Sequence, residues 1–367
     1  YRTTDTVRHL ATNFIRIGAC LMPFTAMTNA LYFALRPVPG LMTRFSRGII
    51  MPLERAVAAV CYRADFSVAE LLYAIAAGVV LLWLGTTVRR LITEKGRRGR
   101  IVYRFALTAV CIVLTVYAGF SLLWGVNYKA DSFQDVSGLT ARPASVDELE
   151  RVAALFAREL AELADQVERD ENGVFAEDRE EILAAAPAVY QNLYEVFPFL
   201  EREDRVPKPL LFSKAYSAMQ FTGFFSPFTG ESNVNVDSPA CLLPATVAHE
   251  LAHQRGVASE QECNFLAIAA CDRCDNVVYR YSGYLKGFIH LNNALYAEDR
   301  DRWQAVRSLL PETVEADLRD HSAYWARFDG ITGTVTQKVY DATLKSYGLT
   351  DGVKSYGTVV DLLIAYF

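Results

Sequence analysis

Long apolar runs mark the first third of the chain, and a mixed polar pattern follows them. The runs Leu71–Val88 and Phe105–Trp124 contain no charged residue. At 1.5 Å per residue, each run is long enough to cross a hydrocarbon core of about 30 Å as a helix. A buried core helix can have the same composition, but two such runs separated by a basic loop favour membrane spans. We therefore predict transmembrane helices over roughly 68–88 and 105–124.

A less uniform apolar stretch near the start of the chain predicts a third span over roughly 14–35. It contains Arg16 and Pro23, which raise the free energy of placing it in a bilayer. With this span included, residues 1–126 form a membrane anchor of about three transmembrane helices, in contact with the lipid bilayer. Residues 127–367 then form a separate domain outside the bilayer.

The charge of the loop between the two stronger runs predicts their orientation. This loop carries Arg89, Arg90, Lys95, Arg97, Arg98, Arg100 and Arg104 against the single acid Glu94. Basic loops stay on the cytoplasmic side of a membrane. The domain over 127–367 is therefore expected on the extracytoplasmic side. The arginines of the 36–66 linker would also lie outside, which weakens this argument without reversing it.

The polar part of the chain predicts a mainly helical domain. Ser145–Val167 is amphipathic, and Ser145 and Glu148 have the spacing of a capping box at its start. Further helices are expected over Glu181–Leu200, Val277–Tyr296, Asp301–Leu309 and Val314–Ala326. In Pro209–Val236, apolar clusters are broken by Gly223, Pro227 and Gly230, which indicates short strands and turns. The fold class is therefore α+β, mainly α with a small β-sheet.

His249, Glu250 and His253 form an H-E-x-x-H motif. Residues four apart lie on the same face of a helix, so both imidazoles can bind one metal ion from a single rigid element. Glu250 is then placed to act as a general base toward the attacking water. An ordinary surface helix would be polar, whereas Leu243–Ala248 leads into the motif without a charge and Gly256 offers a helix end. The motif predicts a catalytic Zn²⁺ site.

A catalytic zinc site usually takes three protein ligands. The chain has only five histidines, and His290 and His321 lie far downstream in the sequence, so a carboxylate is the expected third ligand. Glu260 follows the turn at Gly256 on a second expected helix. Asn264, one turn further along, is placed to support a ligand histidine through a hydrogen bond.

Glu262 is the alternative third ligand. It also has the capping-box spacing to Ser259, which would give it a structural role and leave the metal to Glu260. A strand of the 209–236 segment is expected just before the motif helix. Its edge could accept an extended peptide through main-chain hydrogen bonds, or the sheet could be purely stabilising.

Composition limits the remaining choices. The net charge is −5, and no basic stripe lies outside the membrane loops, so nucleic acid is not an expected partner. Among the seven cysteines, Cys271-x-x-Cys274 lacks the second pair that a structural zinc ribbon needs. Buried free thiols are the expected state, with a disulfide as the alternative outside the cytoplasm.

The chain resembles an uncharacterised bacterial family of membrane proteins that carries a zinc-peptidase motif in a domain of unknown function. The matching segments include Trp124–Tyr128, Thr222–Asn235, His249–Cys271 and Arg280–Tyr284. Glu260–Asn264 is also similar to the E-x-x-A-D/N element of gluzincin peptidases, with Cys263 in place of alanine. The resemblance implies an anchor in the bacterial cytoplasmic membrane and a zincin-like, gluzincin-type domain, with Glu260 as metal ligand and Asn264 orienting a histidine. The short gap between His253 and Glu260 departs from many gluzincins and keeps Glu262 as the alternative.

The resulting hypothesis is a membrane-anchored zinc metallopeptidase acting on a peptide or protein substrate. Zn²⁺ is held by His249, His253 and Glu260, and Glu250 accepts the proton of the attacking water. One alternative is a membrane scaffold that binds zinc without catalysis. The other is an intramembrane protease, although the apolar run before His249 is too short to span a bilayer.

Overall fold

The computed structural model describes residues 25–142, 144–330 and 357–367, together with 23, 333–336, 338, 342 and 345. Within the chain, two compact units are distinguished. The first comprises Tyr1–Ala56 and Val68–Ala130, and the second comprises Val57–Ser67 and Asp131–Phe367. The segment Val57–Ser67 therefore packs with the second unit, although it precedes the longest apolar helix in the sequence.

Helices make up the first unit. They are α2 (Pro39–Phe45), η1 (Ser46–Ile50), α3 (Met51–Cys61), which ends in the second unit, α4 (Val68–Thr93), η2 (Lys95–Arg97), α5 (Arg98–Phe120), η3 (Ser121–Gly125) and η4 (Asn127–Lys129). Residues 25–35 are also helical. The predicted span 14–35 lies partly outside the described residues, so its length as a helix stays a prediction.

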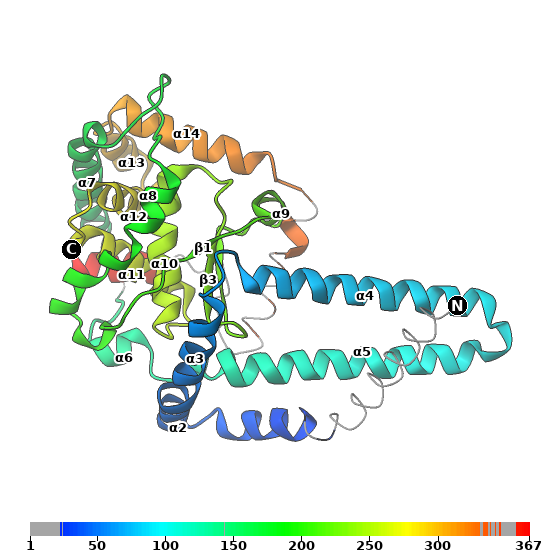
Figure 1. Cartoon of the computed structure of the whole chain (residues 1–367). Helices are drawn as coiled ribbons and strands as arrows, with labels where there is room; N and C mark the ends of the chain where they lie inside the picture. The colour runs from blue at the N-terminus through cyan, green and yellow to red at the C-terminus, as the bar shows by residue number, and fades with distance from the viewer. Residues whose placement is uncertain are drawn as a thin grey trace. The chain divides into compact units, whose positions relative to one another are not determined.

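An antiparallel pair of long helices, α4 and α5, dominates this unit (Figure 1). The rings of Trp83 and Phe105 stack between them with centroids 4.6 Å apart. Two described helical segments, Val68–Thr93 and Lys95–Gly125, are long and apolar enough to cross a membrane. They contain the predicted spans 68–88 and 105–124.

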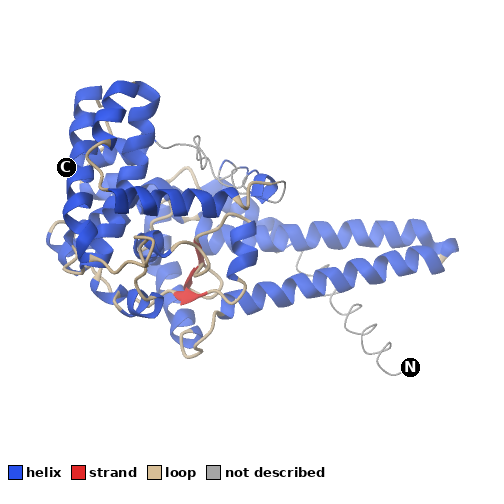
Figure 2. Cartoon of the chain, turned by 90° about the horizontal axis from the view of Figure 1, so that it is seen from above, coloured by secondary structure: helices blue, strands red, loops and turns tan. Residues whose placement is uncertain are grey.

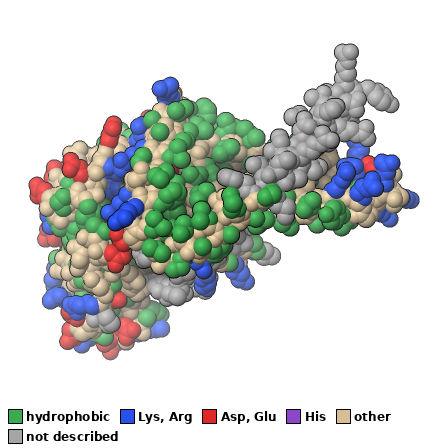
Figure 3. Space-filling view, turned by 90° about the horizontal axis from the view of Figure 1, so that it is seen from below, with side chains coloured by type: hydrophobic (Ala, Val, Ile, Leu, Met, Phe, Trp, Pro, Cys, Tyr) green, Lys and Arg blue, Asp and Glu red, His purple; other side chains and the backbone are tan. Residues whose placement is uncertain are grey.

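Few side chains in the most apolar parts of these two segments are buried, unlike those of a soluble protein's core helix. None of the most apolar window of α4 is buried, and the corresponding window of the second segment is 17% buried. Figure 3 shows apolar side chains along the pair and Lys and Arg side chains gathered at its end. A contiguous apolar surface of this extent indicates contact with lipid or with another protein.

The second unit is mainly helical with one small sheet (Figure 2), as the sequence predicts. Its α-helices are α6 (Phe133–Ser137), α7 (Val146–Leu163), α8 (Arg179–Ala184), α9 (Ser213–Ala218), α10 (Leu243–Gln254), α11 (Glu260–Arg273), α12 (Val277–Glu298), α13 (Arg300–Arg307), α14 (Glu312–Ala326) and α16 (Gly357–Tyr366). The 3₁₀ segments are η5 (Ala164–Gln166), η6 (Ala186–Ala188), η7 (Gln191–Glu195), η8 (Pro198–Leu200) and η9 (Ala240–Leu242). The strands are β1 (Lys208–Pro209), β2 (Gly223–Ser226) and β3 (Glu231–Val234).

Two of the helix predictions have different outcomes. The capping box at Ser145 and Glu148 is present at the start of α7, with both of its reciprocal hydrogen bonds. The single helix predicted over Glu181–Leu200 is wrong, since that segment consists of the end of α8 followed by three short 3₁₀ pieces. Pro187 and Pro198 lie in this segment, and each removes a backbone donor and clashes with a continuing helix.

The sheet corrects one expectation about substrate binding. Its strand order is β1-β3-β2, with β1 parallel and β2 antiparallel to β3. The strand nearest in sequence to the H-E-x-x-H helix, β3, is therefore central and has both edges occupied. A peptide that adds to this sheet would have to use an outer strand. The segment also contains the helix α9, which the expectation of strands and turns missed.

The helix α10 is held in the core of the second unit by its neighbours α11, α12 and β3. Ser232 Oγ on β3 donates a hydrogen bond to the Glu250 carbonyl oxygen at 3.0 Å. On the other side, the Ala245 amide donates to Ser282 Oγ on α12, also at 3.0 Å. Hydrogen bonds to two different elements fix the position of α10 along its axis, which in turn fixes the side chains of the motif.

Candidate metal centre

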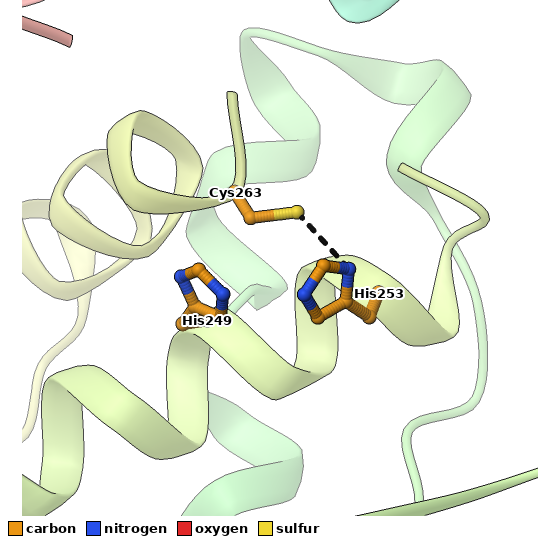
Figure 4. A group of neighbouring side chains, drawn as sticks. All are labelled: His249, His253 and Cys263. Atoms are coloured by element: carbon orange, nitrogen blue, oxygen red, sulfur yellow. Dashed lines mark hydrogen bonds between the residues drawn. The ribbon is translucent and has the colours of Figure 1, made fainter. Parts of the chain in front are cut away.

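The motif histidines lie one helical turn apart on α10. The helix begins with Leu243-Pro244, and a proline is tolerated in the first turn because the amides there have no partner within the helix. It ends just before Gly256, whose φ of 78° lies in the left-handed region that favours glycine. The rings of His249 and His253 point to the same side, with centroids 4.9 Å apart (Figure 4). The sequence prediction of a helix with this end is confirmed.

Each histidine ring is oriented by an acceptor at its Nδ1 atom. Asn264 Oδ1 lies 3.0 Å from His249 Nδ1, and the Val257 carbonyl oxygen lies 2.8 Å from His253 Nδ1. An acceptor at Nδ1 places the proton of a neutral ring there and leaves the lone pair on Nε2. Burial also lowers the pKa of His249 to about 4, so this ring is neutral at pH 7. The Nε2 atom of His249 is therefore in the state that a metal ion requires. The acceptor at His253 Nδ1 turns the Nε2 atom of that ring toward the same centre.

The Glu260 carboxylate lies against both of these nitrogens. Its Oε2 is 3.1 Å from His249 Nε2, and its Oε1 is 3.7 Å from His253 Nε2. With the ring protons on Nδ1, lone pairs of nitrogen would face lone pairs of oxygen. That arrangement is unfavourable unless a proton or a cation lies between them. Two imidazoles and one carboxylate are a ligand set that zinc accepts, so these residues fit the metal that the sequence predicts.

Glu262 points away from this centre. Its carboxylate accepts hydrogen bonds from the backbone amides of Phe133 at 3.0 Å and Gln134 at 3.3 Å, where α6 begins. Only one bond of the predicted capping box forms, from the Glu262 amide to Ser259 Oγ. The other is missing because the Glu262 carboxylate is used to cap α6 instead. The contacts of Glu262 are thus those of a structural residue.

Glu250 lies buried beside the histidines and under β2. Its Oε2 atom is buried and has no hydrogen-bond partner among the described residues. A Cβ atom added at Gly223 would lie only 2.6 Å from Glu250 Oε1, so the backbone of β2 passes directly over this carboxylate. Burial raises the pKa of Glu250 well above its ordinary value. A buried carboxyl group with an unsatisfied oxygen is costly, and such a group suits proton transfer.

Cys263 is close to the same centre, and sequence reasoning did not select it as a site residue. His249, His253 and Cys263 each offer a ligand atom within 4.8 Å of the others (Figure 4). However, Cys263 Sγ approaches His253 from the Nδ1 side, at 3.4 Å, where the ring already contacts the Val257 carbonyl. Burial also raises the pKa of the thiol well above its usual value, which disfavours the thiolate that metals bind.

The six cysteines among the described residues are all free, and all except the half-buried Cys61 are buried, which agrees with the expectation for five of them. The sequence signal for Cys263 was its place one turn after Glu260 on the same helix. That spacing alone does not show which side of the His253 ring the thiol reaches. Glu260, which reaches both Nε2 atoms, is therefore the better third ligand on geometry.

Comparisons with known proteins identify the family of this chain but not its activity. No curated protein and no solved structure matches the chain. One family model matches residues 45–364, which include both long apolar helices and the whole H-E-x-x-H centre. The chain therefore belongs to the family described as "Protein of unknown function (DUF3810)".

Proposed function

We propose that this chain is a membrane-anchored, zinc-dependent peptidase whose second unit hydrolyses peptide bonds. One observation carries the proposal. His249 Nε2 and His253 Nε2 face a single carboxylate, that of Glu260, at 3.1 Å and 3.7 Å. Beside them lies Glu250 with a buried, unsatisfied oxygen. A purely structural metal site has no use for this second carboxyl group.

The residues divide the chemistry among them. His249, His253 and Glu260 would hold the zinc, which supplies Lewis acidity toward a water molecule and the peptide carbonyl. Glu250 accepts a proton from the attacking water and passes it to the leaving amine. Asn264 and the Val257 carbonyl keep the two rings turned so that Nε2 faces the ligand position.

A non-catalytic zinc scaffold is the second candidate, and the position of Cys263 favours it. A thiolate at this position would give a His-His-Cys set, and cysteine is the ligand that structural zinc sites share. The intramembrane alternative has less support, because α10 spans only 12 residues and is too short to cross a bilayer.

Metal content and peptide cleavage together test the proposal. We expect about one zinc per chain in the wild type, a loss of zinc in Glu260→Ala, and retention in Glu262→Ala. The zinc content of each purified protein is measured by mass spectrometry. Glu262→Ala is the matched control because it removes a glutamate from the same turn of α11.

The Glu250→Gln variant separates catalysis from scaffolding. It should keep its zinc and lose cleavage of a mixed peptide library by a factor of about 10² to 10⁴, the usual contribution of a general base. Loss of zinc in Cys263→Ser with full retention in Glu260→Ala would support the scaffold instead. Zinc-free wild type after reconstitution would reject both.

A further inference from the structure

A small cavity in the second unit lies next to the metal centre. Its volume is about 190 Å³, below the range of about 300 to 1,000 Å³ common for drug-sized ligands. Its polar lining comes chiefly from α12 and α14, through Lys286, His290 and His321. A space of this size is suited to one residue or one terminal group of a substrate.

Two lining residues connect the cavity to the catalytic groups. Thr246 lies on α10 at positions i−3 and i−4 from His249 and Glu250, so the three share one face of the helix. Thr222 immediately precedes Gly223, whose backbone lies over the Glu250 carboxylate. The cavity therefore adjoins the Glu250 side of the centre.

Lys286 is the cation of this cavity. Among the described residues, no carboxylate oxygen lies within 4.0 Å of its Nζ atom, and Nζ has no hydrogen bond there. Lys208, a buried lysine of the same unit, shows the contrast. Its Nζ donates to the carbonyl oxygens of Cys61 and Phe66 at 2.9 and 2.8 Å and to Glu231 at 2.7 Å. Lys208 is thus satisfied within the protein, whereas Lys286 faces the cavity.

His321 adds a hydrogen-bond donor to the cavity without adding negative charge. Trp325 Nε1 donates to His321 Nε2 at 3.0 Å, so a neutral His321 ring carries its proton on Nδ1 and can donate from there. Burial lowers the pKa of His321 to about 4 and that of His290 to about 3, so both rings are neutral at pH 7. No aspartate or glutamate is among the described residues that line the cavity.

Two acids outside the cavity, Glu250 and Glu260, act on Lys286 through their charge. A dication held by His249, His253 and Glu260 would offset that negative charge. The balance around Lys286 would then be positive, which favours an anionic ligand. A half-buried cation without a fixed partner is less well solvated than one in water, and a bound anion would compensate for this.

We propose that this cavity binds a carboxylate of the peptide substrate next to the scissile bond, with Lys286 as its ion-pair partner. The inference rests on the proposed peptidase function and specifies its substrate class. The carboxylate has two possible sources, the free C-terminus of a peptide or an acidic side chain. A C-terminal carboxylate would make the chain a carboxypeptidase that releases a single residue.

Binding of synthetic peptides to the zinc-loaded Glu250→Gln protein tests this, because that variant is expected to bind without cleaving. The three probes are acetyl-trialanine with a free carboxylate, the same peptide as its amide, and the amide with a central aspartate. We expect the free-carboxylate peptide to bind about tenfold more tightly than its amide by calorimetry, as for a charge-assisted hydrogen bond. Preference for the aspartate peptide instead would assign the site to an acidic side chain.

A lysine variant then tests whether Lys286 causes the preference for the free carboxylate. Lys286→Met keeps the length of the side chain and should remove the preference, whereas Lys214→Met, at an exposed lysine of the same unit, should retain it. Equal loss in both variants, or no preference among the three peptides in the zinc-loaded protein, would overturn the proposal. The peptide comparison needs no Lys286 variant, so a misfolded Lys286→Met leaves the test intact.

The zinc measurement distinguishes failure of the peptidase proposal from failure of the carboxylate site. If the wild type binds zinc and the peptides bind without preference, the peptidase proposal stands and the carboxylate site fails. If the wild type binds no zinc but prefers the free carboxylate through Lys286, the binding site stands and the peptidase proposal fails.

Discussion

At the scale of single residues, the partner of each histidine decides its use. His249 and His253 have acceptors at Nδ1, which expose Nε2 toward Glu260. His321 has the reverse arrangement, with a donor at Nε2, and belongs to the cavity instead. The same residue type would therefore serve as a metal ligand in the proposed centre and as a hydrogen-bond donor in the cavity.

The Asn264 contact carries a prediction of its own. Asn264→Ala removes the acceptor at His249 Nδ1, so the ring can turn and its proton can move to Nε2. We expect zinc affinity to fall by about 10- to 100-fold, the usual effect of losing such a partner. Competition with a chelator of known affinity measures this. Asn264→Asp, which keeps an acceptor in place, should retain most of the affinity.

That test also separates an orienting role from a purely structural one. Asn264 lies on α11, so its loss could lower zinc binding by disturbing the helix. In that case Asn264→Asp would lose as much affinity as Asn264→Ala, and the thermal midpoint of the metal-free protein would fall. Unchanged stability together with weaker zinc binding is the result that we expect.

The sequence correctly predicted which side chains lie together where the residues are local. The spacing of His249 and His253, and that of Glu260 and Asn264, depends only on one helical turn. Lys286 and His321 could not be placed in this way, because their position beside α10 depends on how α12 and α14 pack. The two downstream histidines looked remote in the sequence, yet the fold brings them to a cavity that adjoins the centre.

At the scale of elements, the close packing of α12 fixes the core around the site. A Cβ atom at Gly287 would lie 2.2 Å from Phe156 Cε1 on α7, and one at Gly283 would lie 2.3 Å from Cys271 Cβ on α11. These two glycines let α12 approach both neighbours. The sequence predicted the helices themselves, but the need for glycine at these contacts appears only when the helices are packed.

We expect Gly287→Ala to destabilise the protein by about 1 to 3 kcal/mol, since the added methyl group must displace the Phe156 ring. Chemical denaturation followed by circular dichroism gives the value. Gly357→Ala is the matched control, because Gly357 is a helical glycine of the same unit with nothing within 4 Å of an added Cβ. Phe156→Leu in the Gly287→Ala background should recover part of the loss. Gly357→Ala should be neutral or slightly stabilising, because alanine loses less backbone entropy than glycine on folding. Equal destabilisation at both glycines would therefore contradict the packing explanation.

Elsewhere the element predictions failed for identifiable reasons. The helical pattern of Glu181–Leu200 was interrupted at its prolines. The 209–236 segment was expected to be strands and turns, yet it also holds α9, whose six residues are too few for periodicity to reveal. The central position of β3 could not be predicted either, since strand order depends on contacts between segments distant in sequence.

At the scale of the whole molecule, α4 and α5 carry the two described segments that are long and apolar enough to cross a membrane. Leu81 and Leu82 on α4 are 68% and 72% exposed, and Val113 on α5 is 65% exposed. Such surfaces are unfavourable in water by about 25 cal/mol per Å², so we propose that α4 and α5 cross a membrane. The basic loop between them would remain on the cytoplasmic side.

Cysteine labelling tests this topology. Lys95 lies in the basic loop and Glu171 in the second unit, and both side chains are exposed. With a membrane-impermeant maleimide on intact cells, Glu171→Cys should be labelled and Lys95→Cys should not, while both should react after the membrane is opened. The unsubstituted chain gives the background from its own cysteines.

Two other labelling patterns would contradict the expected topology, each in a different way. Labelling of Lys95→Cys but not Glu171→Cys in intact cells would reverse the orientation, because the spans would still separate the two positions. The arginines of the 36–66 linker would then outweigh the loop as the cytoplasmic signal. Labelling of both positions in intact cells would show that neither helix separates them across a membrane. The apolar surface of α4 and α5 would in that case have to be covered by another protein.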